Sequence, residues 1–489
     1  MKRRHGIALL GALGLAGTFI AVMPPAQAAA EPVWEACPAT VITAPHTAQC
    51  TKVQVPLDYS DPDGATIELM VSRIASKKPE KRRGILMFNP GGPGGTGLDQ
   101  PAFLANRGMP ASVLDSYDLI GMDTRGVGHS SPVSCGFRAD DAYWANIPPY
   151  ALNDTTAVAE QSALAAEVAQ RCAGNDSDGR LRHITTANMA RDLDRIRVAL
   201  GEEKASFYGA SYGSALGAAY VSLFPESTDR IVLDSNMADT HLDRASLRRY
   251  AHGFEETFPD FAKWAAERHG SYGLGRTAAQ VRKTYFAIAE RLDRAPAADG
   301  TTGAHFRYLT FAGVYHPMQY GRTAHIWQSL LGPATVEAPP VEPGTPHPVD
   351  NALTVYLATT CNDVDWPEDL ATYQRDVAAD RKRYPLYGAA AANILPCAHW
   401  KWEPAEPPVP ISKQGAANIL LLQNRHDPVT PAVNAALLQE RFGKRAKLVT
   451  AEESGHGVYV LSDNACALEL TTAYLVDGRM PARDTTCRN

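Results

Sequence analysis

The sequence predicts an α/β protein with a mostly parallel sheet, helices on both of its faces and a mainly helical insertion. Short apolar runs at 85–88, 117–123, 230–235 and 418–424 are bounded by turn-forming residues, which is typical of buried strands. Residues 188–201 instead place apolar side chains on one helical face and end at a glycine. Strands that are apolar throughout and alternate with helices indicate a sheet that is covered on both faces.

The chain begins with a segment that we expect to be removed on export. Three basic residues at 2–4 precede an apolar run over 7–23, and an Ala-Gln-Ala sequence follows at 26–28. This order predicts a cleaved signal peptide, residues 1–28, and therefore a secreted protein. The apolar run is 17 residues long, which is short of the roughly 20 needed to span a bilayer. We therefore expect no stable membrane anchor.

The charge and the cysteines limit the partners of the mature chain. Loss of three basic residues lowers Lys and Arg from 47 to 44 against 53 Asp and Glu, so the net charge is about −9. An acidic chain argues against a nucleic acid as partner. An even count of eight cysteines fits disulfides in an exported protein. Although sequence does not determine connectivity, four local pairs are expected: 37–50, 135–172, 361–397 and 466–487.

No metal site and no cofactor are expected, because no two cysteines have the Cys-x-x-Cys spacing of a zinc site. We also expect a monomer.

The strand pattern of the sequence breaks between about residue 240 and 400, where helix formers and aromatic residues dominate. We therefore divide the mature chain into a first core part (29–238), a helical lid (239–402) and a second core part (403–489). The alternative, that the middle segment is more of the core, is disfavoured because a core of roughly 250–300 residues is already a large unit.

Ser211 lies between two glycines in the sequence Gly-Ala-Ser-Tyr-Gly at 209–213. A short strand is expected just before it and a small-residue helix just after it, which predicts a sharp strand–turn–helix. Glycines leave room where the strand and the helix nearly touch, and the helix N-terminus offers N–H groups to a negative charge. The alternative is a serine with no role beyond the turn, so a base and an acid must be found elsewhere.

An acid and a histidine follow Ser211 in the chain order that this architecture requires. Asp427 comes directly after the strand at 418–423, and His456 lies between two glycines after the next strand. We assign Ser211 as nucleophile, Asp427 as acid and His456 as base. His426 competes for the base role, but it precedes the acid and has no strand end of its own.

The loop Asn-Pro-Gly-Gly-Pro-Gly-Gly at 89–95 follows the strand at 85–88, where hydrolases of this kind form their oxyanion hole. We predict the N–H groups of Gly92 and Tyr212 as the two donors. The alternative is a Pro/Gly hairpin with no chemical role. The loop at 122–130 is expected to support the site structurally.

The motifs NPGGPGG, DTRGVGHS, GASYGS, RHDPVTP and SGHG together resemble the secreted tripeptidyl aminopeptidases of the α/β-hydrolase fold, relatives of the prolyl aminopeptidases. The resemblance runs from about residue 34 to the last cysteine. It implies the same roles for Ser211, Asp427 and His456, and peptide substrates with a free N-terminus. Pro90 stands where prolyl aminopeptidases have a histidine before the glycine pair.

The leading hypothesis is a secreted serine exopeptidase that releases short peptides, by resemblance tripeptides. The rival is an esterase or amidase acting on a small metabolite with the same triad, whereas a binding protein without activity is disfavoured by the complete set of residues. An aminopeptidase must neutralise the substrate ammonium, so the lid should supply carboxylates. We predict Asp363, and second Asp365, as substrate-binding residues in the acidic run at 359–369. A solvated acidic loop is the alternative.

Overall fold

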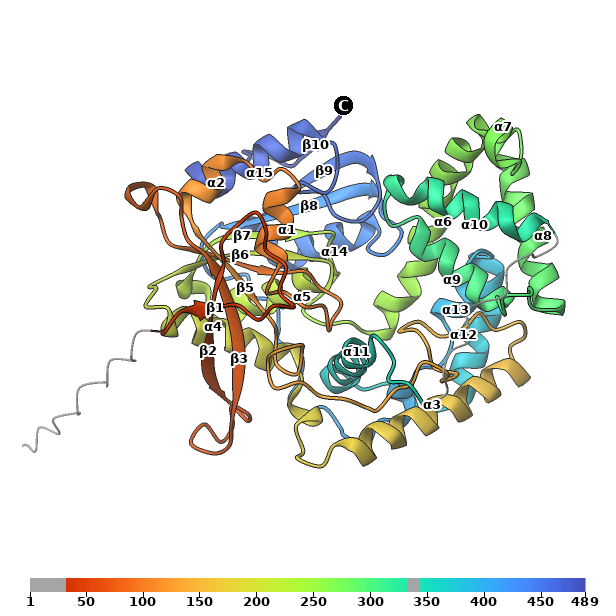
Figure 1. Ribbon diagram of the computed structural model, residues 1–489, viewed down its shortest axis with the longest axis horizontal. Coiled ribbons are helices and arrows are strands. Elements are labelled where there is room, and N and C mark those ends of the chain that lie inside the picture. The colour runs from red at the N-terminus through yellow and green to blue at the C-terminus, as the bar shows by residue number, and fades with distance from the viewer. Residues whose placement is uncertain (1–31, 333–343, 489) are drawn as a thin grey trace, which may run out of the picture.

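The computed structural model describes residues 32–332 and 344–488, so the predicted signal peptide lies outside the described residues. Its centre is a ten-stranded sheet (Figure 1). In sheet order the strands are β1 (Glu35–Ala36), β2 (Gln49–Pro56), β3 (Thr66–Ile74), β5 (Asp118–Met122), β4 (Ile85–Asn89), β6 (Ala205–Ala210), β7 (Thr228–Asp234), β8 (Ile419–His426), β9 (Ala446–Ser454) and β10 (Thr485–Cys487).

The sheet is parallel from β5 to β10, and only the N-terminal strands β1, β2 and β3 pair antiparallel. The predicted mostly parallel sheet is therefore confirmed, with an antiparallel extension at one edge. The carboxyl ends of β4, β6, β7, β8 and β9 point the same way because these strands are parallel. Such an edge is where open α/β sheets bind ligands.

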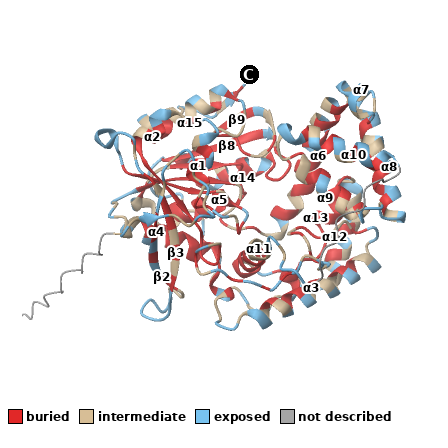
Figure 2. Cartoon of the chain, in the orientation of Figure 1, coloured by how far each residue is buried: buried red, intermediate tan, exposed pale blue. Residues whose placement is uncertain are grey.

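Helices cover both faces of the sheet. Alternate side chains of a strand point to opposite faces, and those of β4 do so: Ile85 and Met87 belong to one apolar cluster, Leu86 and Phe88 to another. The first cluster includes α4 (Thr186–Ala199), α5 (Tyr212–Leu223) and α14 (Ala432–Phe442). The second includes α1 (Gln100–Asn106), α2 (Ala111–Ser116) and α15 (Ala465–Asp477). Figure 2 shows the buried residues concentrated in the sheet and on the inner helix faces.

Helices also make up the insertion between β7 and β8, which lies beside the sheet in Figure 1. They are α6 (Arg244–Glu267), α7 (His269–Tyr272), α8 (Ala278–Arg294), α9 (Gly303–Gly313), α10 (Tyr320–Leu331), α11 (Asp350–Asp363), α12 (Leu370–Arg383) and α13 (Gly388–Ala391). Short 3₁₀ turns are η1 (Pro79–Lys81), η2 (Leu181–His183), η3 (Pro225–Ser227), η4 (Pro317–Gln319), η5 (Pro396–His399) and η6 (Gly443–Arg445).

One helix from before the insertion packs against it. The long helix α3 (Thr156–Asn175) lies within the expected first core part, yet it packs against α12 and η5. Val158 of α3 shares a buried apolar cluster with Tyr373 and Val377 of α12. The helices of the expected lid are therefore packed against a helix that precedes β6 in the chain. The lid boundaries at 238 and 402 stay a prediction.

The four expected disulfides are confirmed: Cys37–Cys50, Cys135–Cys172, Cys361–Cys397 and Cys466–Cys487. Each disulfide joins two cysteines that have no other cysteine between them in the sequence. Within the described ranges, no helix combines the length and the apolar character needed to cross a bilayer.

Candidate active site

Ser211 occupies the sharp turn between β6 and α5, with a φ of 59° and a ψ of −126°. A positive φ is strained for serine and persists only where the surroundings hold it. A Cβ on Gly209 would overlap the carbonyl oxygen of Gly213, and a Cβ on Gly213 would lie 2.6 Å from the carbonyl oxygen of Asn89. The expected strand–turn–helix is present, and close backbone approach explains both glycines.

Asp427 and His456 form a hydrogen-bonded pair at the ends of β8 and β9. The Nδ1 atom of His456 lies 2.9 Å from Oδ2 of Asp427 and 3.0 Å from Oδ1. Asp427 is 1% exposed and also accepts the N–H groups of Val429 and Thr430, at 2.9 and 2.8 Å. A carboxylate beside Nδ1 favours the tautomer with the proton on that atom. This leaves Nε2 as the basic nitrogen.

The surroundings of His456 favour its charged form. Burial by itself lowers the pKa of His456, but the charge and the hydrogen bond of Asp427, together with the charge of Asp234, raise it above the ordinary value. A raised pKa means that the surroundings stabilise the imidazolium, which forms when a histidine takes up a proton.

Asp234, the last residue of β7, ties the His456 loop to the Ser211 turn. Its carbonyl oxygen accepts the N–H of Ser211 at 2.9 Å. Its fully buried carboxylate accepts the N–H groups of Val458 and Tyr459, at 2.9 and 2.8 Å. Burial raises the pKa of Asp234 to about 6 in spite of these hydrogen bonds. The loop after His456 is therefore held at the strand end that also holds Ser211.

The hydroxyl of Ser211 makes no hydrogen bond with the His456 ring among the described residues. Without a substrate, catalytic hydrogen bonds are often long and tighten only in the complex. The structure thus brings the three predicted residues to one edge of the sheet and joins two of them directly. The third is placed through Asp234.

The glycine-rich loop at 89–95 lies against the nucleophile turn. Gly91 has a φ of 95°, and a Cβ there would lie 2.5 Å from the carbonyl oxygen of Ala210 and 2.9 Å from Cβ of Ser211. Gly92, the next residue, is exposed. The N–H of Tyr212 belongs to the first turn of α5, where helical N–H groups lack a helical acceptor. The assignment of Gly92 and Tyr212 as oxyanion donors stays a prediction.

The loop at 122–130 supports the glycine-rich loop. The carboxylate of Asp123 accepts the N–H of Gly97, two residues after the glycine-rich loop, and the N–H of His129, both at 2.9 Å. A buried aspartate that satisfies backbone donors on two loops holds their relative position. These contacts agree with the structural role expected for this loop.

The two predicted substrate-binding carboxylates lie in different surroundings. Asp363 ends α11 and is 6% exposed; its oxygens accept the N–H and the hydroxyl of Thr186, at 2.8 and 2.5 Å. Burial raises the pKa of Asp363 to about 7, although both contacts with Thr186 lower it. Asp365 is exposed in the segment after α11. Substrate binding by either residue stays a prediction.

Three residues near His456 were missed by sequence reasoning. Besides Asp234, the hydroxyl of Thr430 donates to Asp427 at 2.8 Å and lies 3.3 Å from Nδ1 of His456. The carbonyl oxygen of Tyr315, in the lid, accepts the N–H of His456 at 2.6 Å. Thr430 belongs to the motif RHDPVTP, so its closeness to Asp427 in the sequence could have indicated the contact. No sequence pattern around Tyr315 indicates its contact with His456.

The rival base, His426, pairs with the lid instead. Its Nδ1 lies 2.7 Å from Oδ2 of Asp260 on α6. The hydrogen bond with Asp260 raises the pKa of His426, against the opposing effect of burial. His426 is thus engaged by a different aspartate from the one that holds His456.

Comparison with known proteins identifies the family. A family model described as TAP-like protein matches residues 384–487, and one described as alpha/beta hydrolase fold matches 84–314. A tripeptidyl aminopeptidase of Streptomyces lividans is 34% identical, covering 96% of this chain and 89% of its own. Two Mycobacterium tuberculosis relatives are more distant. Serine protease Hip1 is 28% identical (91% of this chain, 88% of its own), and carboxylesterase B is 29% identical (90% and 86%).

A match at this identity over nearly the whole of both chains agrees with the parallel sheet, the helical insertion and the serine at the strand–turn–helix. The chain belongs to the tripeptidyl-aminopeptidase-like family of the α/β hydrolases, and it is a serine hydrolase.

Proposed function

We propose that the protein is an exported serine exopeptidase that releases short peptides, tripeptides in particular, from free N-termini. The observation that carries the proposal is the hydrogen-bonded pair of His456 and the buried Asp427, held at the same sheet edge as Ser211. The full-length similarity to a tripeptidyl aminopeptidase supports the peptide substrate. The basic and apolar start of the chain and its four disulfides support export.

The reaction follows from the roles of these side chains. The Ser211 hydroxyl attacks the scissile carbonyl carbon while Nε2 of His456 takes its proton, and Asp427 stabilises the resulting imidazolium. The N–H groups of Gly92 and Tyr212 bind the oxygen as it becomes negative. His456 then gives the proton to the leaving amine, which departs and leaves an acyl-enzyme. Water attacks this ester with His456 as base, releasing the peptide acid and restoring Ser211.

Exopeptidase specificity requires recognition of the substrate ammonium, and the lid is where we place it. A carboxylate that binds an ammonium must present a free oxygen to it. Asp365 is exposed and is our candidate for this contact. Asp363 is the weaker of the two for this role, because it is buried and each of its oxygens already accepts a hydrogen bond from Thr186.

A panel of chromogenic substrates tests the proposal: mono-, di- and tripeptides, each free and N-acetylated, beside short-chain esters. We expect the highest kcat/KM for free tripeptides. Equal cleavage of free and acetylated tripeptides would overturn the exopeptidase assignment. A maximum at free dipeptides or single residues would keep the exopeptidase and correct the length of the released peptide.

The second candidate is an esterase or amidase that acts on a small molecule. The full-length similarity to a carboxylesterase B favours it, since the same residues serve any acyl transfer. Fast turnover of esters with no cleavage of any free peptide in the panel would establish this second function instead.

A further inference from the structure

A continuous chain of hydrogen bonds joins the lid to the residue after the nucleophile. The hydroxyl of Tyr212 lies 2.5 Å from Oγ1 of Thr186, the first residue of α4. Oγ1 of Thr186 lies 2.5 Å from Oδ2 of Asp363, and the Thr186 N–H donates to Oδ1 at 2.8 Å. All three side chains are buried. The chain therefore crosses from α11 of the lid to α4 and α5 of the core through three buried side chains.

The hydrogens along this chain have one consistent direction when Asp363 is ionised. The Thr186 hydroxyl has a single hydrogen, which it donates to the carboxylate. Its oxygen must then accept the hydrogen of the Tyr212 hydroxyl, because the two oxygens are 2.5 Å apart. The N-terminus of α4 also favours a negative charge beside its first N–H. Every donor of the chain is satisfied, and each oxygen of Asp363 accepts one hydrogen bond from Thr186.

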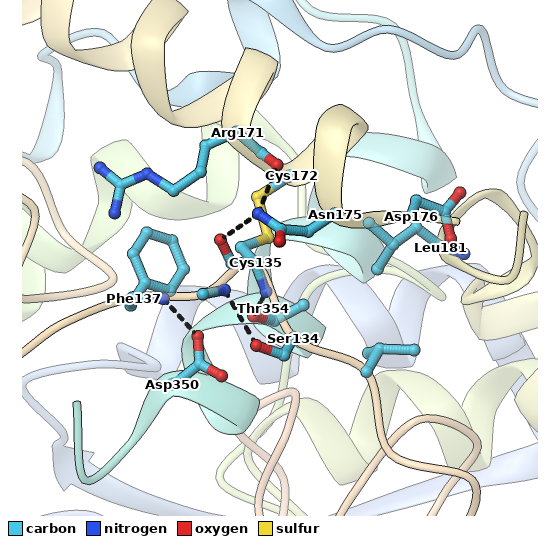
Figure 3. Close-up of a disulfide and its surroundings, with 12 residues drawn as sticks. Ser134, Cys135, Phe137, Arg171, Cys172, Asn175, Asp176, Leu181, Asp350 and Thr354 are labelled. Atoms are coloured by element: carbon cyan, nitrogen blue, oxygen red, sulfur yellow. Dashed lines mark hydrogen bonds between the residues drawn. A yellow bond between two sulfur atoms is a disulfide. The ribbon is translucent and has the colours of Figure 1, made fainter. Parts of the chain in front are cut away.

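The helix that carries Asp363 is held at its N-terminal end by the core segment around a disulfide. Figure 3 shows Asp350 and Thr354 of α11 beside the bond between Cys135 and Cys172. Asp350 accepts the N–H of Phe137 at 2.7 Å, and Thr354 accepts the N–H of Cys135 at 2.8 Å. These contacts fix the start of α11.

The C-terminal end of α11 is fixed as well. The side-chain amide of Asn362 donates to the carbonyl oxygen of Leu181 at 2.7 Å, and Cys361 is linked to Cys397. Near the other end of the helix, the carbonyl oxygen of Ala352 lies 2.5 Å from where a Cβ on Gly94 would stand. One lid helix therefore touches the glycine-rich loop at one end and reaches Tyr212 through Thr186 at the other.

We propose that Asp363 is a positioning residue that acts through Thr186 to hold Tyr212, so that a lid helix sets the position of an oxyanion donor. The proposal rests on the proposed function, which assigns the N–H of Tyr212 to the oxyanion. Tyr212 directly follows Ser211, whose φ of 59° needs fixed surroundings. An anchored Tyr212 hydroxyl supplies part of that fixation. The role differs from ammonium binding because it serves every acyl substrate.

Two variants test the chain from its two ends, with kcat and KM measured on a free tripeptide anilide and on a short-chain ester. Tyr212→Phe removes only the hydroxyl, and we expect kcat to fall about tenfold on both substrates, since misplacement costs less than loss of a donor. Asp363→Ala breaks the chain at its origin, and we expect kcat to fall by the same factor, roughly tenfold, on both substrates. KM should change by less than about twofold.

The conservative variant Asp363→Asn should restore most of the activity lost in Asp363→Ala. Its amide oxygen can accept the Thr186 N–H, while its amide nitrogen donates to Oγ1 of Thr186. Thr186 then turns its own hydrogen toward Tyr212, so all contacts persist with the hydrogens reversed. An ammonium-binding role predicts the opposite pattern: Asp363→Asn would lower turnover of the free peptide and spare the ester.

Asp380 of α12 supplies the matched control. It is a lid carboxylate that is 4% exposed and accepts two hydrogen bonds from Arg248, at 2.7 and 2.9 Å. Asp380→Ala should lower the unfolding temperature and leave kcat on both substrates unchanged. An equal fall in kcat in Asp380→Ala and Asp363→Ala would show general damage to the lid and overturn the positioning role.

The remaining outcomes separate this inference from the proposed function. If the native enzyme cleaves esters and no peptides, the proposed function is wrong, yet the ester rates still test Asp363. If peptides are cleaved as proposed, unchanged ester turnover in both Tyr212→Phe and Asp363→Ala would make the positioning role wrong. Should Asp363→Ala fail to fold, Tyr212→Phe and Asp363→Asn decide, because both keep the buried volume.

Discussion

The sheet core and the lid hold the candidate site by different means. In the core, Asp427 and Asp234 end neighbouring strands, and their carboxylates accept backbone N–H groups that follow within a few residues or come from the adjacent loop. The lid instead acts through contacts between distant residues, such as Tyr315 on His456 and Asp363 on Thr186. The core thus holds the site through contacts close to the strand ends, whereas the lid reaches it through contacts between residues far apart in the sequence.

The largest expected effect comes from breaking the core at its nucleophile. Ser211→Ala should lower kcat by about 10⁶-fold and abolish labelling by a fluorophosphonate, and adding His456→Ala should cost little more, because the residues act as a unit. The circular dichroism spectrum should be unchanged. Near-normal turnover or labelling in Ser211→Ala would contradict the mechanism and the importance given to the core.

The two core aspartates should separate chemistry from support. Asp427→Asn should lower kcat by about 10⁴-fold, because the amide favours the wrong tautomer of His456. Asp234→Asn should chiefly lower the free energy of unfolding, by about 1–3 kcal/mol, since an amide cannot accept from all the donors around it. Rates on an ester and urea unfolding of both variants check this. A larger fall in kcat for Asp234→Asn would reverse the two roles.

N-acetylation of the substrate measures how much ammonium binding by the lid contributes to kcat/KM. Removing the ammonium should lower kcat/KM by about ten- to a hundredfold, the value of a charge-assisted contact of about 1.5–3 kcal/mol. Asp365→Asn should give a similar loss on free tripeptides and none on esters. If N-acetylation lowers kcat/KM but Asp365→Asn leaves it unchanged, another lid group binds the ammonium, and only the assignment of Asp365 is wrong.

The smallest expected effect is a shift in the pH dependence of kcat/KM. It depends on His456 of the core, whose pKa differs from that of His316 in the lid. His456 must be neutral to act as base, and its pKa is raised, so kcat/KM should fall with decreasing pH at a midpoint above 6.5. In the lid, burial and the charge of His456 lower the pKa of His316 to about 4, so this group stays neutral there.

An ester is the substrate for this measurement, because a peptide ammonium titrates near pH 8. A midpoint at or below 6.5 would show that Asp427 and Asp234 do not hold the charged form of His456 as described.

Much of the core could be predicted because its signals are local. Apolar runs bounded by turns identify strands, and the close approach of β6 and α5 requires small residues at fixed distances from Ser211. The disulfides also follow chain order. The packing of α3 against the lid was not predicted, since its apolar face fits a core helix and a lid helix equally well.

The amino-acid sequence was enough to predict the α/β architecture, the helical insertion, the presence of disulfides and the candidates Ser211, Asp427 and His456. The strands and the turn at Ser211 rest on residue types at short spacing, and Asp427 and His456 rest on their order after Ser211. The burial of Asp363 against Thr186, the exposure of Asp365 and the contacts of Asp234 and Tyr315 with the segment around His456 became visible in the folded chain alone. The physical reason is that burial and hydrogen-bond partners depend on which distant segments meet, and no local pattern encodes that meeting.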